Sequence, residues 1–421
     1  GIFTNNSVIS SDAGKTGVTL VKINGSTTVG DKTGTLINTA DLTALGDNST
    51  VIYVTNNGKI SNTGNITVNN GTGIKLEYSS LLAGDNKGTI TVNGSGIGIL
   101  AGASSYNGSI LVNDGTINLQ SNGTGICVAS GTAYMNGTNA ENKGKINFNG
   151  TGGTGIYVTD VKTTAKYSAD LISDQRNVTG ITVTKTATAS NNADITLTGD
   201  NSVGINIINN GVLTSNTGTI TVNNGIGIKV KDSTLSNNQN TGIIKVEAEN
   251  GIGISGVNSN ITNNGVIYVK NAGLGFYGNN SDLKNYGQIN VTDGTGIAVE
   301  NNSVLSNNAS LNITGEGTGI TGISSNITNQ STGNITVKKG TNISASNSTV
   351  KNYGMLSNEN GTGIYGNNSD VENYGTINIE NGTGAVVENR SLLVNNASFD
   401  ITGEGTGIVG TNSTITNQST G

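Results

Sequence analysis

The chain has 421 residues, of which 33% are hydrophobic, 4% aromatic and 11% charged, and its formal net charge is −6. It has no His, Pro or Trp and one cysteine, Cys127, so an intrachain disulfide and a Cys/His zinc site are both excluded. The mild acidity and the lack of basic clusters argue against nucleic acid or an anionic membrane as a partner.

A repeated marker organises the chain. Residues 1–50 are irregular and are interpreted as a degraded start of the repeat array. Beyond them, an apolar residue closes a Gly-Thr-Gly or Gly-Ile-Gly every 21 to 27 residues in most steps. The clear markers are Ile74, Ile99, Ile126, Ile156, Ile228, Ile254, Phe276, Ile297, Ile320, Ile364 and Ile408. Weaker markers are Ile2, Val51 or Ile52, Ile181, Ile205, Ile343 and Ala385.

The unit between two markers is built of short strands. Between Phe276 and Ile297 lie three short apolar runs, separated by Asn-Asn, Asn-Tyr-Gly and Asp-Gly-Thr-Gly. Alternation such as Ile-x-Val is typical of strands, and Asn and Gly tolerate positive φ at tight corners. A unit that cannot bury its apolar face alone can do so by stacking on its neighbours. We therefore expect an all-β fold, a right-handed parallel β-helix of about 18 triangular coils of about 22–25 residues.

Beyond residue 50, the chain falls into three parts that differ in how regular the coils are expected to be. We expect regular coils in 51–125, coils with lengthened corners and an irregular segment in 126–200, and regular coils in 201–421. Within the last part, residues 278–333 align without gaps to 366–421, with 39 of 56 residues identical. An offset of four coils indicates that single coils are interchangeable modules.

Three columns of residues are predicted from the spacing. Two are apolar and inward-facing: Leu283, Leu305, Ile327, Val350, Val371, Leu393 and Ile415; and Ile289, Leu311, Ile335, Leu356, Ile377 and Phe399. The third is a structural ladder of stacked side-chain amides: Asn285, Asn307, Asn329, Asn352, Asn373, Asn395 and Asn417.

Candidate binding positions lie where the pattern breaks or where aromatics face outward. A lengthened corner is expected near Thr132–Glu141, and a distorted, more charged coil over 159–177 contains Arg176. Tyr157, Tyr277 and Tyr365 each follow a marker and should point out, where an aromatic ring can stack on sugar or anchor a protein. The competing interpretation is that these tyrosines only fill a β-compatible surface. Cys127 falls in the same outward column.

A second set of tyrosines occupies a corner. Tyr286, Tyr353 and Tyr374 follow the Asn of the predicted ladder. Tyr353 and Tyr374 belong to adjacent coils and are expected to stack on one another.

The sequence contains no recognisable set of catalytic, cofactor-binding or metal-binding residues. Nucleophile–base pairs that use His are unavailable, and many acids recur with the coil, as Glu316 and Glu404 do. The repeated glycines lack the Lys-Ser or Lys-Thr of a phosphate loop, and the calcium-binding nonapeptide is absent. The chain is not expected to be an enzyme or to need a cofactor.

The repeats "GTGIY", "NYGTINI" and "ITNQSTGNITV", rich in Asn and free of Pro, resemble passenger domains of type V autotransporters. The likeness is greatest to the large outer-membrane autotransporter adhesins of fusobacteria. The resemblance implies a monomeric, non-catalytic segment displayed at the cell surface, attached to the outer membrane through a C-terminal barrel not present in this chain. It also implies binding to glycans or protein receptors of host cells, immune cells included, or to partner bacteria.

Two alternatives stay open at this point. The segment could be a structural stalk that displays a binding site located elsewhere in a longer protein. More distantly, it could be a polysaccharide-processing β-helix enzyme. The sequence shows no signal peptide and no apolar run long enough to span a bilayer, so we interpret it as a piece of a longer protein that does not itself insert into a membrane.

Overall fold

The structure, a computed structural model, describes residues 1–26, 34–77, 81–103, 110–130, 139–160, 164–233 and 239–418. Its regular elements within these ranges are all β-strands, and strands of successive coils pair in parallel. The all-β parallel β-solenoid expected from the repeats is confirmed. Within the described ranges, no helix is both long and apolar enough to cross a membrane. The chain divides into two compact units, Gly1–Gly218 and Thr219–Gly421.

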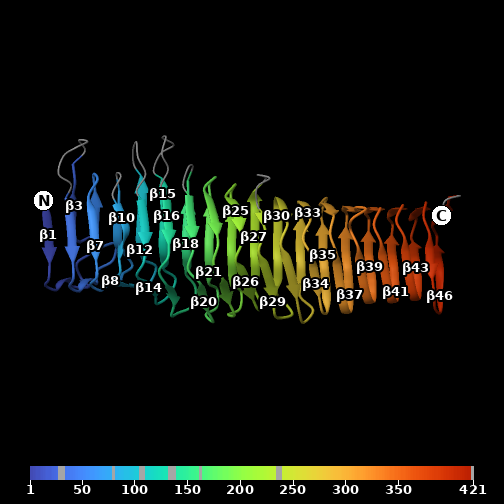
Figure 1. The fold of residues 1–421 in the computed structure, drawn as a ribbon, viewed down its shortest axis with the longest axis horizontal. Helices are drawn as coiled ribbons and strands as arrows, with labels where there is room; N and C mark the ends of the chain where they lie inside the picture. Colours follow the sequence, from blue (N-terminus) through green and yellow to red (C-terminus); the bar gives the residue numbers. More distant parts are fainter. Residues whose placement is uncertain are drawn as a thin grey trace. The chain divides into compact units, whose positions relative to one another are not determined.

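Each coil of the first unit contributes three strands, which we call the ladder, middle and marker strands, and successive coils follow one another in Figure 1. The ladder strands are β1 (Ile2–Asn5), β4 (Thr35–Asn38), β7 (Lys59–Asn62), β10 (Leu81–Asn86), β13 (Ile110–Asn113), β16 (Asn139–Asn142), β19 (Thr164–Tyr167), β22 (Thr188–Asn191) and β25 (Val212–Asn216). The middle strands are β2 (Ile9–Ser11), β5 (Leu42–Ala44), β8 (Ile66–Asn69), β11 (Thr89–Asn93), β14 (Thr116–Leu119), β17 (Ile146–Phe148), β20 (Leu171–Ser173) and β23 (Ile195–Leu197). The marker strands are β3 (Thr19–Asn24), β6 (Thr50–Thr55), β9 (Thr72–Leu76), β12 (Ile97–Ala103), β15 (Thr124–Ser130), β18 (Thr154–Thr159), β21 (Thr179–Thr184) and β24 (Val203–Ile208).

The second unit has the same three strand types. Its ladder strands are β28 (Gln239–Asn240), the end of β30 (Ile252–Asn263), β33 (Asp282–Asn285), β36 (Val304–Asn307), β38 (Asn326–Asn329), β40 (Thr349–Asn352), β42 (Asp370–Asn373), β44 (Leu392–Asn395) and β47 (Thr414–Asn417). Separate middle strands are β26 (Thr219–Val222), β29 (Ile243–Val246), β31 (Val266–Val269), β34 (Ile289–Val291) and β45 (Phe399–Ile401). The marker strands are β27 (Ile226–Ser233), the start of β30, β32 (Leu274–Asn279), β35 (Gly294–Glu300) and β46 (Gly405–Thr411). Four strands run through the middle and marker positions without a break: β37 (Leu311–Ile323), β39 (Ile335–Ser346), β41 (Leu356–Asn367) and β43 (Ile377–Glu388).

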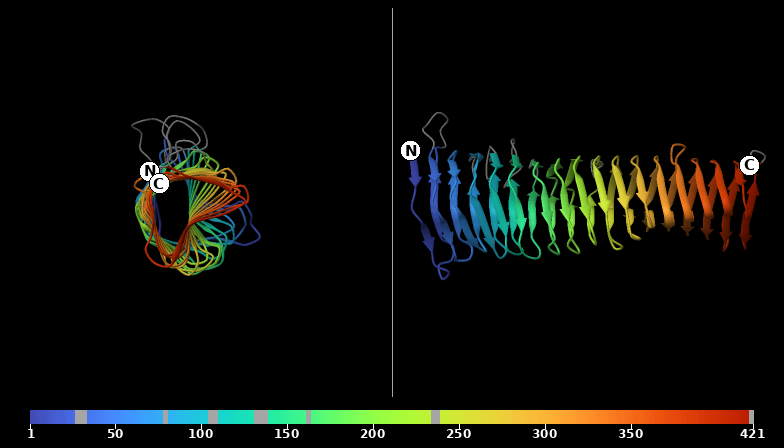
Figure 2. Two further views of the ribbon diagram at one scale, coloured as in Figure 1. Left: turned by 90° about the vertical axis from the view of Figure 1, so that its right-hand side faces the viewer. Right: turned by 60° about the horizontal axis from the view of Figure 1, so that its bottom comes forward.

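The core of each unit lies inside its coils, and Figure 2 views the coils along their stacking direction. Alternation decides which side chains enter it: in β14, Ile117 and Leu119 are fully buried, whereas the residues between and before them are half-buried. Burying an Ile or Leu side chain stabilises the fold by about 1.5–3 kcal/mol, and this gain recurs in every coil. Both predicted apolar columns are buried up to the last coil, where Phe399 is half-buried and Ile415 is 41% exposed. The expectation of a buried Ile415 is wrong, because no further described coil covers it.

The recurring Gly-Thr-Gly is explained by close approach between coils. In the second unit the first glycines stand in register, Gly340 on Gly361 and Gly361 on Gly382. A Cβ at Gly361 would lie 1.9 Å from the carbonyl oxygen of Gly340, and one at Gly363 would lie 2.5 Å from that of Gly384. Any larger residue would force neighbouring coils apart, so the same corner requires glycine once per coil.

The number of about 18 coils is slightly too high. Ile2 was counted as a marker, but it lies in β1, which pairs with β4 through Ile2 and Thr35. β1 is thus a ladder strand, and the first described marker strand is β3, whose Val21 pairs with Ile52. A lone apolar residue without its Gly-Thr-Gly cannot distinguish these two strand types.

An amide ladder crosses the second unit at the end of the ladder strands. Each side-chain Nδ2 donates to the Oδ1 of the Asn in the next coil at 2.7–2.9 Å, from Asn285 through Asn307, Asn329, Asn352, Asn373 and Asn395 to Asn417. The second hydrogen of Asn352 goes to the carbonyl of Gly354 at 3.1 Å, which ties the ladder to the corner. Asn352 is fully buried, so these bonds satisfy groups that water cannot reach.

A serine ladder at the next corner was not predicted. Ser281 Oγ accepts a hydrogen bond from the backbone N–H of Ser259 at 3.1 Å and donates to the carbonyl of Asn279 at 2.8 Å. The same arrangement recurs at Ser348 and Ser369. At Ser281 and Ser369 the corner serine ends an Asn-x-Ser triplet, which begins at Asn279 and Asn367.

Candidate ligand-binding face

The outward residues of the marker strands form one column in each unit. In the first unit the register gives Lys22, Tyr53, Lys75, Leu100, Cys127, Tyr157, Thr182 and Asn206. In the second unit it gives Lys229, Ser255, Tyr277, Ala298, Thr321, Ser344, Tyr365, Val386 and Val409. Tyr157, Tyr277 and Tyr365 are half-buried members of these columns. Phe3, which follows Ile2, lies in the ladder strand β1 and is not a member of these columns.

Tyr277 belongs to a polar cluster that joins two coils. Its hydroxyl donates to Oε1 of Glu300, which lies two residues beyond Ala298, the register partner of Tyr277. Asn279 Nδ2 donates to the same Oε1 at 2.9 Å and approaches the Tyr277 hydroxyl at 3.3 Å. Burial, followed by the hydrogen bond to Glu300, raises the pKa of the Tyr277 phenol. The ring is thus held at the surface by a carboxylate and an amide.

Tyr365 has the same surroundings four coils further on. Its hydroxyl donates to Oε2 of Glu388 at 3.2 Å, and Asn367 Nδ2 donates to the Tyr365 hydroxyl at 3.3 Å. Glu388 lies two residues beyond Val386, the register partner of Tyr365. The duplicated block therefore carries two copies of one side-chain arrangement on one face of the second unit.

A related cluster occurs in the first unit around Tyr53. Its hydroxyl donates to Glu77 Oε2 at 2.5 Å, and Lys75 Nζ lies 2.9 Å from Glu77 Oε1. Lys22 and Lys75 also place their Nζ atoms 5.2 and 5.1 Å from the ring centroid. Partial burial works to raise the pKa of Glu77, but its hydrogen bonds to Tyr53 and Lys75 outweigh burial and lower it. Unlike the clusters of the second unit, this one is covered by cations.

Tyr157 lies between Cys127 and Thr182 in its column. The residue two positions beyond Thr182 is Thr184, so the position that holds a carboxylate beside Tyr277 and Tyr365 holds a buried hydroxyl here. Tyr157 therefore offers a ring without the acidic partner.

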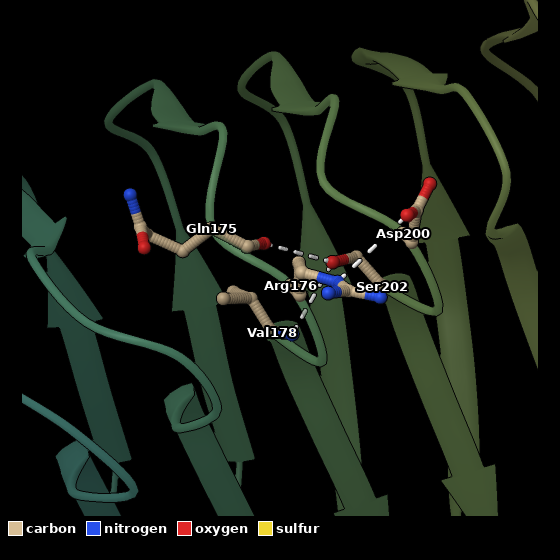
Figure 3. Close-up of polar contacts among 5 residues, drawn as sticks. All are labelled: Gln175, Arg176, Val178, Asp200 and Ser202. Carbon is tan, nitrogen blue, oxygen red and sulfur yellow. Dashed lines mark hydrogen bonds and ion pairs between the residues drawn. The ribbon is translucent and has the colours of Figure 1, made fainter.

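Arg176 lies at a corner of the coil and not among the outward residues of the marker strands. It precedes β21, and its Nε lies 3.8 Å from Asp200 Oδ2 of the next coil (Figure 3). Its side chain is 65% exposed, so this ion pair contributes at most a few tenths of a kcal/mol after screening. Its carbonyl accepts a hydrogen bond from the N–H of Gly152 at 2.8 Å, and nearby Ser202 Oγ donates to the carbonyl of Gln175 at 3.2 Å. The backbone of Arg176 is fixed while its guanidinium remains largely open to solvent.

Of the irregular segment 159–177, residues 159–160 and 164–177 are described. It contributes β19 and β20, which pair with β22 and β23 of the next coil. Of the lengthened corner near Thr132–Glu141, residues 132–138 lie outside the described part of the chain, and β16 begins at Asn139.

The corner tyrosines Tyr353 and Tyr374 stack on one another. Their ring centroids are 5.0 Å apart with an interplanar angle of 7°. Tyr374 also donates to Glu372 Oε2 at 2.9 Å, and this bond raises the pKa of its phenol. Each ring thus has one face covered by the other, while the two residues remain 41% and 44% exposed.

The described residues contain no group of three or more His, Cys, Asp or Glu side chains placed to hold a metal ion. Cys127 is partly shielded in its column. Burial, with a smaller contribution from the Asp160 carboxylate, raises the pKa of its thiol to about 11. The thiol is therefore protonated at neutral pH and a poor nucleophile.

Comparison with known proteins finds a match for one part of the chain. Residues 161–305 match the family model of the BigA third pectate lyase-like domain. This BigA-like stretch covers about a third of the chain and includes Arg176, Tyr277 and Glu300. The model represents a domain of a bacterial surface protein, and its pectate lyase-like description refers to the β-helix fold. No curated protein and no solved structure gave a significant match.

Sequence reasoning found the tyrosines but missed their partners. In the sequence, Glu300 lies 23 residues beyond Tyr277, and Asn279 lies two residues beyond it. Glu388 and Asn367 have the same two spacings from Tyr365. The recurring interval of 23 residues between Tyr and Glu was the available signal. It is one coil plus two residues, which places both side chains on one outward face.

Proposed function

We propose that the chain is a non-catalytic adhesin segment of a bacterial surface protein. It binds glycans or protein receptors of host cells, immune cells included, or of other bacteria. The segment is a monomer, it needs no cofactor, and its parent protein is attached to the bacterial outer membrane. The observation that carries this proposal is the outward column of the second unit, where two half-exposed tyrosines are each held by a carboxylate and an amide.

The fold supports a role in recognition. Backbone groups are satisfied by strand pairing and by the Asn and Ser ladders, so outward side chains can vary without loss of the core. An aromatic ring beside hydrogen-bonding groups is a frequent component of sugar and protein recognition sites. The BigA-like stretch also supports the assignment to a bacterial surface protein.

The absence of catalysis is part of the same proposal. The chain has no His, and its one thiol has a raised pKa. The carboxylates of the Tyr277 and Tyr365 clusters belong to separate copies four coils apart, whereas glycoside hydrolysis uses a pair of carboxyl groups on one bond. A stalk is the second candidate, and the four-coil duplication after residue 277 favours it for that half of the chain.

Direct binding separates the two candidates. The full chain is titrated onto epithelial and immune cells, alone and after glycosidase treatment of the cells. Saturable binding at submicromolar concentration supports the adhesin, and its loss after glycosidase treatment assigns the ligand to glycans. Absence of binding up to micromolar concentration contradicts the adhesin and leaves the stalk. A chain lacking 366–421 serves as a second test, because a stalk has no binding to lose.

A further inference from the structure

The Tyr277 and Tyr365 clusters occupy equivalent register positions and share the Tyr–Glu and Asn–Tyr hydrogen bonds, and the Tyr277 cluster has in addition a bond from Asn279 to Glu300. Both tyrosines occupy the outward column of the marker strands, and four register steps connect them. With parallel strands about 4.8 Å apart, the two clusters lie roughly 19 Å apart along the second unit. The column positions between them hold Ala298, Thr321 and Ser344, whose short side chains leave the two rings as the largest groups of the column.

Each cluster retains hydrogen-bonding capacity toward a ligand. Within the described residues, the hydrogen bonds of the first cluster use Oε1 of Glu300, and those of the second use Oε2 of Glu388, so one carboxylate oxygen of each remains able to accept. In the second cluster Asn367 Nδ2 has one hydrogen beyond the one that it donates to the Tyr365 hydroxyl, whereas both hydrogens of Asn279 Nδ2 are used within the first cluster. A ring face beside a carboxylate acceptor matches the apolar face and neighbouring hydroxyls of a sugar ring.

The charge of the clusters decides which sugars fit. Among the residues that the structure describes, each copy carries one carboxylate and no cation in hydrogen-bond contact with it, so an anionic sugar would be repelled at close range. A cationic peptide could also pair with the carboxylate, so it is the competing ligand in the test below. A neutral sugar donates its hydroxyl hydrogens to the open carboxylate oxygens and packs its apolar face on the rings, so it uses both parts of each cluster.

We propose that the Tyr277 and Tyr365 clusters are two equivalent subsites for a neutral, linear glycan that lies along the coils of the second unit. The proposal rests on the proposed adhesin function and specifies its ligand class. A glycan long enough to reach both subsites binds the second one intramolecularly, so its affinity exceeds that of a short glycan.

The test uses the full chain and N-acetyllactosamine oligosaccharides of one and four disaccharide units, each with and without terminal sialic acid, in calorimetric titrations. We expect two short neutral ligands per chain, one long ligand per chain, and on the order of 100-fold tighter binding of the long ligand. Terminal sialic acid should weaken binding of the short form at least severalfold. Either Tyr277→Ala or Tyr365→Ala should reduce the stoichiometry for the short ligand to one and abolish the advantage of length.

Matched variants keep the test independent of folding. Glu300→Gln and Glu388→Gln preserve side-chain shape and should weaken the short ligand, whereas Tyr157→Ala removes an outward ring without a carboxylate partner and should change nothing. The inference is overturned if no oligosaccharide binds, if sialylated forms bind more tightly, if an oligolysine peptide binds in their place, or if Tyr157→Ala has the same effect. Cell binding that survives the Tyr277→Ala/Tyr365→Ala double variant would refute these subsites while leaving the adhesin intact.

Discussion

Asn191 stands in register with Tyr167 of the preceding coil, and its buried side-chain oxygen has no hydrogen-bond partner among the described residues. In the ladder, each amide donates to the oxygen of the Asn in the next coil, as Asn113 does to Asn142 at 2.8 Å. Tyr167 takes the ladder position between Asn142 and Asn191 and carries no amide. The irregular segment 159–177 therefore interrupts the ladder of the first unit.

Restoring the amide should stabilise this coil. Tyr167→Asn supplies a donor for Asn191 Oδ1 and an acceptor for Asn142 Nδ2, and we expect the free energy of unfolding to rise by about 1–2 kcal/mol. Urea unfolding of the variant and of the parent measures the difference. Tyr167→Ser is the control, because it shortens the side chain without extending the ladder. Equal stability of the Asn and Ser variants would refute the explanation.

Removing a central rung should have the opposite effect. Asn352→Ala leaves Asn373 Oδ1 and the carbonyl of Gly354 without their donor, and Asn329 Nδ2 without its acceptor. Since these groups are buried, the free energy of unfolding should fall by about 2–4 kcal/mol. Asn360→Ala, at an exposed position of the next strand, should change it by less than about 0.5 kcal/mol. A loss no larger than that of Asn360→Ala would show that the ladder has little energetic role.

The repeat spacing was enough to predict the fold class because each coil obeys the same local constraints. Gly361 and Gly363 are required by close backbone approach, so their recurrence marks the same corner every time. The Asn ladder was predictable because each Asn follows an inward apolar residue at a fixed distance of two. Both inferences need only the period of the sequence.

The hydrogen-bond partners of the tyrosines could be identified only from the register of the paired strands. The contact of Tyr277 with Glu300 depends on the pairing of Tyr277 with Ala298, and one residue of slip would turn Glu300 inward. The misassignment of Ile2 has the same origin, because β1 can be identified as a ladder strand only through its pairing with β4. Ser281 was overlooked because abundant Asn and Ser obscure a triplet whose meaning lies in its position.

The serine ladder offers a separate test of corner energetics. Ser281→Ala removes the acceptor for the buried N–H of Ser259, so the free energy of unfolding should fall by about 1–3 kcal/mol. Ser344→Ala, on the outward face of a marker strand, is the matched control with an expected change below about 0.5 kcal/mol. Chemical denaturation of both variants provides the comparison, and equal effects would contradict a specific role for the corner serine.

Alkaline pH should selectively weaken the Tyr277 cluster. The folded-state pKa of Tyr277 is raised by burial and by Glu300, so its protonated form is favoured in the folded chain. The associated stability is present below the ordinary phenol pKa of about 10 and is lost as pH rises through the folded value. Urea unfolding between pH 8 and 11 should show a smaller alkaline loss for Tyr277→Phe than for the parent chain. An identical loss in both proteins would contradict the proposed coupling to Glu300.

The reactivity of Cys127 tests the environment of the outward column in the first unit. A thiol pKa raised from 9.0 to about 11 reduces the thiolate fraction at pH 8 on the order of 100-fold. Alkylation by iodoacetamide at pH 8 should therefore be about that much slower in the folded chain than in urea. Asp160→Asn removes the smaller, electrostatic part of the shift and should accelerate the folded-state reaction modestly, while burial keeps it well below the unfolded rate. Alkylation at the same rate with and without urea would mean that Cys127 is neither shielded nor perturbed, and that the column in which Tyr157 also lies is open to solvent along this stretch.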